Sequence, residues 1–263
     1  MGSPRGPRRA HILVSNDDGI DAPGIFALVR ELKTFADVTV VAPDRQQSAV
    51  GHAITMNYPL RAVPVRRGEE LFGYAVSGTP ADAVKLGVRF LLRRPPDLLM
   101  SGINHGSNTA ISVIYSGTVS AATEGTILGI PSIAISLTTH GEADFSYAAR
   151  FGGRVARLVL RRGLPPGTLL NVNVPAVDEK RIRGVRVTRQ GASTWDDTFD
   201  VRRDPANREY FWLTGRLKVT DTDPGVDEVA VRNRYVSITP IRYDLTDVAM
   251  LRKLKAWKVE ALR

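Results

Sequence analysis

Residues 11–25 read HILVSNDDGIDAPGI, and this stretch decides the fold class. Its first five residues, His11–Ser15, form a short apolar run that is typical of a buried β-strand. A polar turn follows at residues 16–19, and residues 23–34 then have the apolar spacing of an amphipathic helix. A buried strand that runs through a polar turn into a helix is the first half of a β–α–β unit.

The same alternation continues down the chain. Four further short apolar runs resemble buried strands, at residues 38–42, 97–101, 132–136 and 169–174. Helical stretches are expected between them, at residues 79–90, 117–128 and 145–161. Continuous apolar strands that alternate with helices predict an α/β fold, with a mostly parallel sheet covered by helices on both faces.

The pattern changes after about residue 175. Residues 182–220 are rich in aromatic side chains and predict a β-hairpin or arm, residues 235–241 a strand, and residues 248–262 a basic amphipathic helix. We therefore expect three parts in the chain: a flexible basic arm over residues 1–10, a catalytic core over residues 11–175 and a C-terminal extension over residues 176–263.

The composition excludes several classes of protein. The 263 residues include no cysteine, which excludes disulfides, thiolate metal sites, iron–sulfur clusters and a cysteine nucleophile. The motifs of P-loop nucleotide binding, dinucleotide binding and serine esterases are also absent. No window has the ~18 to 20 consecutive apolar residues of a membrane span. We expect a cytoplasmic protein without a membrane partner.

The net charge of +9 is concentrated at the two ends of the chain. Residues 1–10 and 250–263 together supply +7, which leaves +2 for residues 11–249. A nucleic-acid-binding protein is expected to have a basic body with aromatic platforms. We therefore expect no specific nucleic-acid partner, and an RNA- or polyphosphate-binding role for the basic ends stays as a rival hypothesis.

Polar, glycine-containing segments follow three of the predicted strands and precede one of the predicted helices. They are residues 15–19, 43–52, 102–108 and 115–118. Ligands of an open parallel sheet bind outside the carboxyl ends of its strands. We therefore expect these four segments to converge on one site.

Asp17 and Asp18 form the strongest candidate for chemistry in these segments. Two adjacent carboxylates repel each other, and this raises a carboxyl pKa unless a cation lies between them. Oxygen ligands suit Mg²⁺, Mn²⁺ or Ca²⁺, and Ser48 and Asn104 would complete an oxygen shell. The alternative is structural: an Asp-Asp-Gly turn that caps the next helix, with Ser48 and Asn104 as turn formers.

A second candidate is the tripeptide Ser116-Gly117-Thr118 at the start of a predicted helix. Its hydroxyls and free backbone N–H groups would suit an anion, and an ordinary helix N-cap is the alternative. His52 and His105 lie in the same group of loops. Either side chain is able to donate to phosphate or act as a general acid, and a solvated or structural histidine is the alternative.

Six motifs occur along the chain in a fixed order: ILVSNDDGIDAPGI, VVAPDRQQSAVGHAIT, SGTPADAVKLG, LMSGINHGSNT, YSGTVSAATEG and IPSIAIS. With NVNVP near Asn171 and YVSITPI further on, they closely resemble the survival protein SurE family of metal-dependent phosphatases. The resemblance covers about residues 11–247 and is weakest in the N-terminal arm and over residues 190–220. One departure is His105, because a basic residue often follows the asparagine in the family, as in Asn-Arg-Gly. It would make a phosphate contact at this position pH-dependent.

The resemblance implies a Rossmann-like core and a C-terminal hairpin or helix that is exchanged between the subunits of a homodimer or homotetramer. It implies hydrolysis of nucleoside 5′-monophosphates, with 3′-monophosphates and short polyphosphates as further substrates. It also implies one divalent cation per subunit, Mg²⁺ or Mn²⁺, with Ca²⁺ as an inert occupant. A non-catalytic metal- and nucleotide-binding regulatory module is the alternative.

The resemblance also assigns residues to the site. The family's metal ligands correspond to Asp17, Asp18, Ser48 and Asn104. We expect the catalytic residues to be Asp17, Asp18, Asn104 and Ser116, with Asp17 bridging the metal and the attacking water. We expect phosphate and substrate contacts at Asn16, Gly51, His105, Asn108, Ser116, Gly117 and Thr118.

Overall fold

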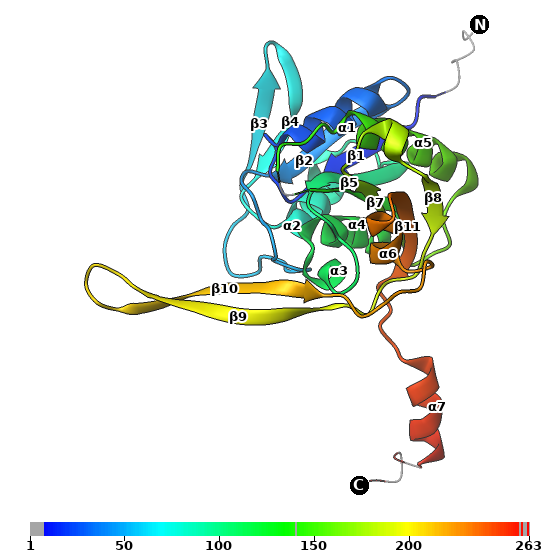
Figure 1. The fold of residues 1–263 in the computed structure, drawn as a ribbon. Helices are drawn as coiled ribbons and strands as arrows, with labels where there is room; N and C mark the ends of the chain where they lie inside the picture. Colours follow the sequence, from blue (N-terminus) through cyan, green and yellow to red (C-terminus); the bar gives the residue numbers. More distant parts are fainter. Residues whose placement is uncertain (1–7, 140, 258, 260–261, 263) are drawn as a thin grey trace, which may run out of the picture.

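The computed structural model describes residues 8–139, 141–257, 259 and 262. The chain folds around a nine-stranded sheet of strand order β3-β4-β2-β1-β5-β6-β7-β11-β8, and β9 and β10 form a separate hairpin (Figure 1). The predicted α/β fold with a mostly parallel sheet is confirmed. Most of the basic arm predicted at residues 1–10 lies outside the described residues.

Five parallel strands form the centre of the sheet. They are β1 (His11–Ser15), β2 (Asp37–Pro43), β5 (Leu98–His105), β6 (Ser132–Thr138) and β7 (Thr168–Pro175). All five residues of β1 are buried, as expected for a strand covered on both faces. On one side of this centre, β4 (Glu70–Val76) pairs parallel with β2, and β3 (Ala62–Arg67) closes the edge antiparallel to β4.

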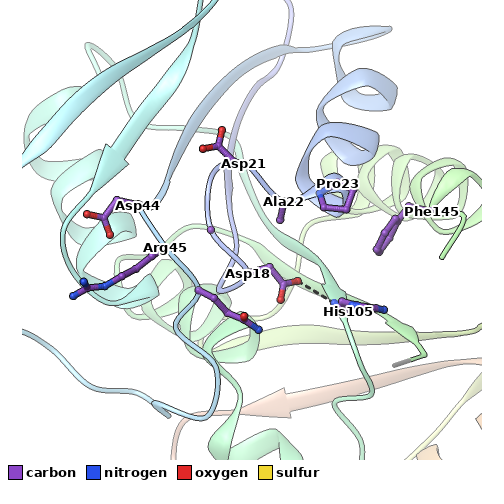
Figure 2. Close-up of a pocket in the computed structure, with 11 residues that line it drawn as sticks. Asp18, Asp21, Ala22, Pro23, Asp44, Arg45, His105 and Phe145 are labelled. Atoms are coloured by element: carbon purple, nitrogen blue, oxygen red, sulfur yellow. Dashed lines mark hydrogen bonds between the residues drawn. The ribbon is translucent and has the colours of Figure 1, made fainter. Parts of the chain in front are cut away.

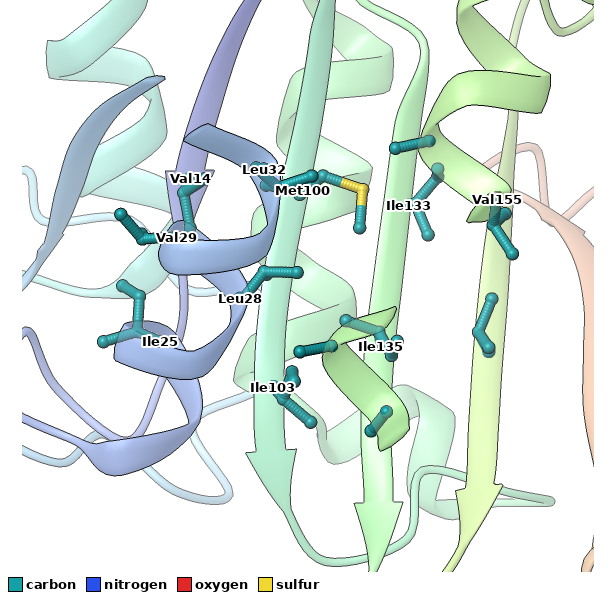
Figure 3. Close-up of a cluster of buried hydrophobic side chains, with 14 of the residues drawn as sticks. Val14, Ile25, Leu28, Val29, Leu32, Met100, Ile103, Ile133, Ile135 and Val155 are labelled. Carbon is teal, nitrogen blue, oxygen red and sulfur yellow. The ribbon is translucent and has the colours of Figure 1, made fainter. Parts of the chain in front are cut away.

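Helices cover both faces of the sheet. On one face, α1 (Pro23–Lys33) and α5 (Ser146–Arg162) pack on a large apolar cluster, in which Leu28 of α1 lies near Met100 and Ile135 of the sheet (Figure 3). On the other face, α2 (Pro80–Leu86) and α4 (Gly117–Ile127) bury a second cluster. Gly24 lets α1 approach β5, because a Cβ atom there would lie 2.0 Å from the carbonyl oxygen of Ile103.

The connections contain four short helical segments. These are the π-helical turn η1 (Gly87–Leu91), α3 (Ser112–Tyr115), the 3₁₀ turn η2 (Glu179–Arg181) and α6 (Asp227–Arg232). Of these, α3 leads directly into α4, and α6 directly precedes β11.

The main sheet continues beyond residue 175. There, β11 (Tyr235–Arg242) pairs antiparallel with β7, and β8 (Gly184–Val187) adds to the edge parallel to β11. The hairpin predicted over residues 182–220 is therefore shorter, because β8 finds a partner in the main sheet. It consists of β9 (Thr194–Arg203) and β10 (Glu209–Lys218).

Two segments of the C-terminal part extend away from the body of the molecule. The β9–β10 hairpin, called the arm below, projects to one side, and α7 (Val248–Ala256) lies beyond the sheet (Figure 1). Of the helix predicted over residues 248–262, residues 258, 260 and 261 lie outside the described part of the chain. Within the described ranges, no helix combines the length and the hydropathy needed to cross a membrane.

Candidate active site

The candidate site lies where the strand order reverses. From β1 the sheet continues through β2 on one side and through β5 on the other, so the loops after these strands open a crevice at their carboxyl ends. The loops contact one another there: the backbone N–H of Gln47 donates to the carbonyl oxygen of Asp17 at 2.7 Å. The N–H of His105 donates to Asp18 Oδ2 at 3.0 Å.

Asp17 is the more buried of the two candidate carboxylates, with 4% of its surface exposed. Its Oδ1 accepts a hydrogen bond from the hydroxyl of Thr118, at the start of α4. Burial raises the pKa of Asp17 to about 6; the hydrogen bond from Thr118 opposes this rise, and the charge of Asp18 adds to it. A cation beside these carboxylates would offset the cost of burying their charge.

Asp18 is half-buried and faces the crevice. Burial raises the pKa of its carboxyl group, and the backbone N–H and the charge of His105 oppose this rise. The backbone of His105, rather than its side chain, therefore orients Asp18, as the dashed line in Figure 2 shows.

The residues around the two carboxylates fit a divalent cation. The side-chain oxygen of Asn16 is buried and has no hydrogen-bond partner among the described residues. Asn104 donates through Nδ2 to the carbonyl oxygen of Gly106 at 2.9 Å, which leaves its amide oxygen as a possible ligand. Ser48 is exposed on the neighbouring loop, where its hydroxyl accepts from Gln46 at 2.8 Å. Such oxygen donors suit Mg²⁺ or Mn²⁺.

Within the described ranges, the oxygen donors around Asp17 and Asp18 are joined by neither a histidine nor a third carboxylate at metal-site spacing. Among the described residues, no group of three or more His, Cys, Asp or Glu side chains has the arrangement of a metal site. A cation at Asp17 and Asp18 would therefore depend on hydroxyl, amide and water oxygens for the rest of its coordination.

The N-terminus of α4 lies directly against Asp17. Ser116 is the N-cap residue, and its Oγ accepts from the backbone N–H of Val119 at 3.0 Å. A Cβ atom at Gly117 would lie 2.7 Å from the Cβ of Asp17, so only glycine allows this approach. An 11-residue helix thus points its positive end at the carboxylates, where an anion would also be stabilised.

Three of the residues predicted to contact phosphate are engaged elsewhere. The N–H of Gly51 donates to the carbonyl oxygen of Tyr115 at 3.1 Å. Asn108 is buried, and its side-chain Nδ2 donates to Ser136 at 2.9 Å. The imidazole of His105 bonds to the carbonyl oxygen of Gly141 at 2.6 Å. By contrast, Gly117 and Thr118 lie directly against Asp17, and Ser116 caps the helix that begins with them.

The hydrogen-bond partners of His52 were not predicted from the sequence. Its Nε2 bonds to Glu124 Oε2 at 3.0 Å, and Lys85 donates to the other oxygen at 2.6 Å. Glu124 is buried inside α4, where burial raises its pKa, but the bonds from His52 and Lys85 outweigh that effect and leave its pKa below the ordinary value. The loop after β2 is thereby tied to α4. The available signal for a buried partner was Glu124 itself, the one acidic residue in the small-residue helix predicted over residues 117–128.

A cavity of about 390 Å³ opens beside Asp18. Asp18 and His105 form part of its wall, and Asp21, Asp44 and Phe145 lie around it (Figure 2). The sequence predicted no role for Asp21 or Phe145, and Asp44 was expected at the site only as part of segment 43–52, because no local pattern distinguishes these residues from ordinary loop residues. The cavity adjoins the Asp18 carboxylate and has room for part of a small molecule.

Comparisons with known proteins identify the family of this chain. The family model described as Survival protein SurE matches residues 12–197. A 5′-nucleotidase SurE of Chlorobaculum tepidum is 48% identical over 254 residues, which cover 97% of each chain. One of Syntrophobacter fumaroxidans is 50% identical over 248 residues, 94% of this chain and 99% of the relative.

A solved structure shows the same fold. The crystal structure of the SurE protein from Aquifex aeolicus superimposes with a TM-score of 0.82 at 41% identity, and it covers 94% of this chain and 99% of that one. The family suggested by the six motifs is confirmed by the family model and by relatives that match nearly the whole chain. The chain belongs to the survival protein SurE family.

Proposed function

We propose that this protein is a 5′-nucleotidase that hydrolyses nucleoside 5′-monophosphates to nucleoside and phosphate with one bound divalent cation, Mg²⁺ or Mn²⁺. The observation that carries the proposal is the pair Asp17 and Asp18 at the end of β1, with the buried carboxylate of Asp17 facing the N-terminus of α4. Relatives that match nearly the whole chain are named 5′-nucleotidase SurE, which supports the same activity.

Each group at the site has a role in this proposal. Asp17, Asp18, Ser48 and Asn104 would hold the cation, which when bound supplies Lewis-acid polarisation of the phosphoryl group. The Asp17 carboxylate, oriented by Thr118, would take the proton of the attacking water. The backbone N–H groups of residues 116–118 would bind the phosphate oxygens as negative charge develops on them.

The cavity beside Asp18 suits the nucleoside half of the substrate. Its volume of about 390 Å³ lies in the range of small-molecule sites. Carboxylates of Asp21 and Asp44 would accept hydrogen bonds from ribose hydroxyls, which are donors. We place 3′-monophosphates and short polyphosphates among the further substrates.

The experiment is phosphate release from a panel of 5′- and 3′-nucleotides by metal-stripped protein, with and without added Mn²⁺ or Mg²⁺. We expect release only with metal. We expect Asp17→Asn to lower kcat by a factor of ~100 or more, equivalent to at least ~2.7 kcal/mol in the activation barrier. Asp37→Asn, which removes a carboxylate at the amino end of β2, is the matched control and should retain wild-type turnover.

Two outcomes would contradict the proposal. Near-wild-type turnover by a folded, metal-loaded Asp17→Asn protein would remove Asp17 from the mechanism. Calorimetric binding of metal and nucleotide with no phosphate release from any substrate would favour the non-catalytic regulatory module.

We also propose that the arm joins subunits of a homodimer or homotetramer. In its register, Phe199 lies opposite Leu213, and Val201 lies opposite Phe211. Residues paired across an antiparallel hairpin share a face, so these four exposed side chains form one apolar face of the arm. A hairpin of two strands is only marginally stable in water by itself, and a second copy of this chain would cover that face.

A cytoplasmic location completes the proposal. A chain without cysteine suits a reducing compartment, and the nucleotides of the cell would be its substrates. Cell fractionation followed by an immunoblot tests the location, and recovery of the protein outside the cytoplasmic fraction would contradict it.

A further inference from the structure

Asp227, at the start of α6, is a fully buried carboxylate that takes no part in the site described above. Its Oδ2 accepts from the backbone N–H of Ala110 at 3.0 Å. Its Oδ1 accepts from the N–H groups of Gly191 at 2.9 Å and Glu228 at 2.8 Å. Burial raises the pKa of Asp227 although these three bonds oppose the rise. Among the described residues, its hydrogen-bond partners are these backbone N–H groups alone, so the buried charge has no cationic partner there to offset the cost of its burial.

Ala110 is held in a conformation that few residues adopt. Its φ is +50°, in the left-handed region, where a residue other than glycine is strained. Besides the bond to Asp227, its carbonyl oxygen accepts from Gln190 Nε2 at 2.8 Å. Gly191 packs against it so closely that an added Cβ would lie 3.3 Å from the Ala110 Cβ. The surrounding contacts therefore impose this backbone conformation.

Ala110 connects two parts of the site. On its N-terminal side, the carbonyl oxygen of Asn108 accepts from Asn171 at 2.7 Å, which fixes that residue to β7. On its C-terminal side, α3 begins at Ser112 and leads within four residues to Ser116, the N-cap of α4. The N–H of Val113 donates back to the carbonyl oxygen of Ala110 at 3.3 Å. The direction in which the chain enters α4 thus depends on the turn at Ala110.

We propose that Asp227 is a positioning residue for the hydrolysis: by fixing the backbone of Ala110, it places residues 116–118 against Asp17. The inference rests on the proposed function, because it concerns the segment assigned there to phosphate. Asp227 touches neither the substrate nor the cation ligands and acts only through Ala110. Because Gly191, three residues before the arm, shares the same carboxylate, the arm and the phosphate segment are held by one side chain.

The test compares Asp227→Asn with the wild type. An asparagine has one accepting oxygen, so its Nδ2 would face either the Ala110 N–H or the pair at Gly191 and Glu228. We expect kcat/KM for a 5′-nucleotide to fall about 10- to 100-fold, the range expected for misplacement near 1 Å, and the inhibition constant of inorganic phosphate to rise. The Mn²⁺ dissociation constant, measured by calorimetry, should rise by a smaller factor than the inhibition constant of phosphate, because only the Asp17 ligand contacts the displaced segment.

Asp221→Asn is the matched control. Asp221 accepts from the N–H of Ala192 at 3.0 Å, one residue beyond Gly191, and has no bond to Ala110. We expect this variant to retain the wild-type kcat/KM and phosphate affinity. If Asp221→Asn lost as much kcat/KM and phosphate affinity as Asp227→Asn, any disturbance at the base of the arm would have the same effect. That result would overturn the proposal.

A rescue separates positioning from a merely structural role. Glycine adopts positive φ freely, so adding Ala110→Gly to Asp227→Asn should recover at least about threefold in kcat/KM. No recovery would overturn the action through Ala110. If Asp227→Asn does not fold, Gln190→Met, which removes the side-chain bond to the Ala110 carbonyl oxygen, carries the test. It should lower kcat/KM about threefold or more, with a smaller change in Mn²⁺ affinity. An unchanged kcat/KM in a folded variant would overturn the proposal.

Failure of the proposed function would look different. It would appear as a wild-type protein that releases no phosphate with any cation. Binding of inorganic phosphate to the metal-loaded protein would then test Asp227. Weaker binding by Asp227→Asn than by Asp221→Asn would support its positioning role, and equal binding would overturn it.

Discussion

Two buried carboxylates near the site, Asp17 and Glu124, have opposite environments. Asp17 has a hydroxyl partner and a neighbouring negative charge, and burial raises its pKa to about 6. Burial also raises the pKa of Glu124, but His52 and Lys85 bind both of its oxygens and bring its pKa below the ordinary value. Asp17 is thus suited to receive a cation from solution, whereas Glu124 already has its basic partners in the fold.

Glu124 predicts a pH-dependent contribution to stability. Because its pKa is lowered in the folded state, its ionised form stabilises the protein above the ordinary value of 4.5, and this contribution is lost as pH falls through the folded pKa. Glu124→Gln should lower the free energy of unfolding by about 2 kcal/mol at pH 7, and the difference should shrink below pH ~4.5. Urea unfolding of both proteins across this range measures it, and a difference independent of pH would contradict the assignment.

At the scale of elements, α4 determines the distance between the anion-binding segment and the carboxylates. It is buried along most of its length, with Ala121 and Ala122 packed against the sheet. Its first residue, Gly117, has no space for a side chain beside Asp17 and Pro80. Since the helix is nearly surrounded by other elements, a larger residue at its start displaces the end of the helix from Asp17 more easily than it shifts the whole core.

Gly117→Ala tests this close approach. The added Cβ would lie 2.7 Å from the Asp17 Cβ, so we expect kcat/KM to fall at least ~10-fold while the protein stays folded. Thr123→Ala is the control on the same helix, because its hydroxyl bonds only to the carbonyl oxygen of Val119. Steady-state kinetics and circular dichroism of both variants check the prediction. Equal activity of the two would show that the helix start tolerates a side chain.

In the molecule as a whole, the sheet and the arm differ in how their apolar faces are covered. The sheet buries both of its faces with helices of the same chain. The arm is exposed along all ten residues of β9, and no part of the chain that the structure describes covers its apolar face. Exposed apolar surface of this kind is typical of an interface between proteins.

Charges on the two faces of the arm should have different effects on assembly. Phe199→Glu with Leu213→Lys places an opposite-charge pair on the apolar face, and we expect light scattering to show a fall to the monomer mass. Thr198→Glu with Thr214→Lys makes the same pair on the other face and should leave the mass of the assembly unchanged. An unchanged mass in the first variant would exclude this face as a subunit contact.

Much of the fold was predictable because its signals are local. Each parallel strand is a short apolar run, and the polar segments that follow β1, β2 and β5 do meet at one edge. The role of His105 was less predictable, since its backbone holds Asp18 while its imidazole bonds to Gly141. The pairing of β8 with β11 was also not predictable, because a four-residue strand is too short for its residue pattern to show which edge of the sheet it joins.

The amino-acid sequence predicts the succession of strands and helices along the chain, the polar segments at the strand ends and the pair Asp17 and Asp18. These depend on the periodicity of neighbouring residues. The partners of the buried carboxylates, in contrast, are set by tertiary packing. Asp17 meets Thr118 across 101 positions, Glu124 meets His52 across 72, and Asp227 meets Ala110 across 117. Contacts at such separations form only when helices pack on the sheet, and no local pattern encodes them.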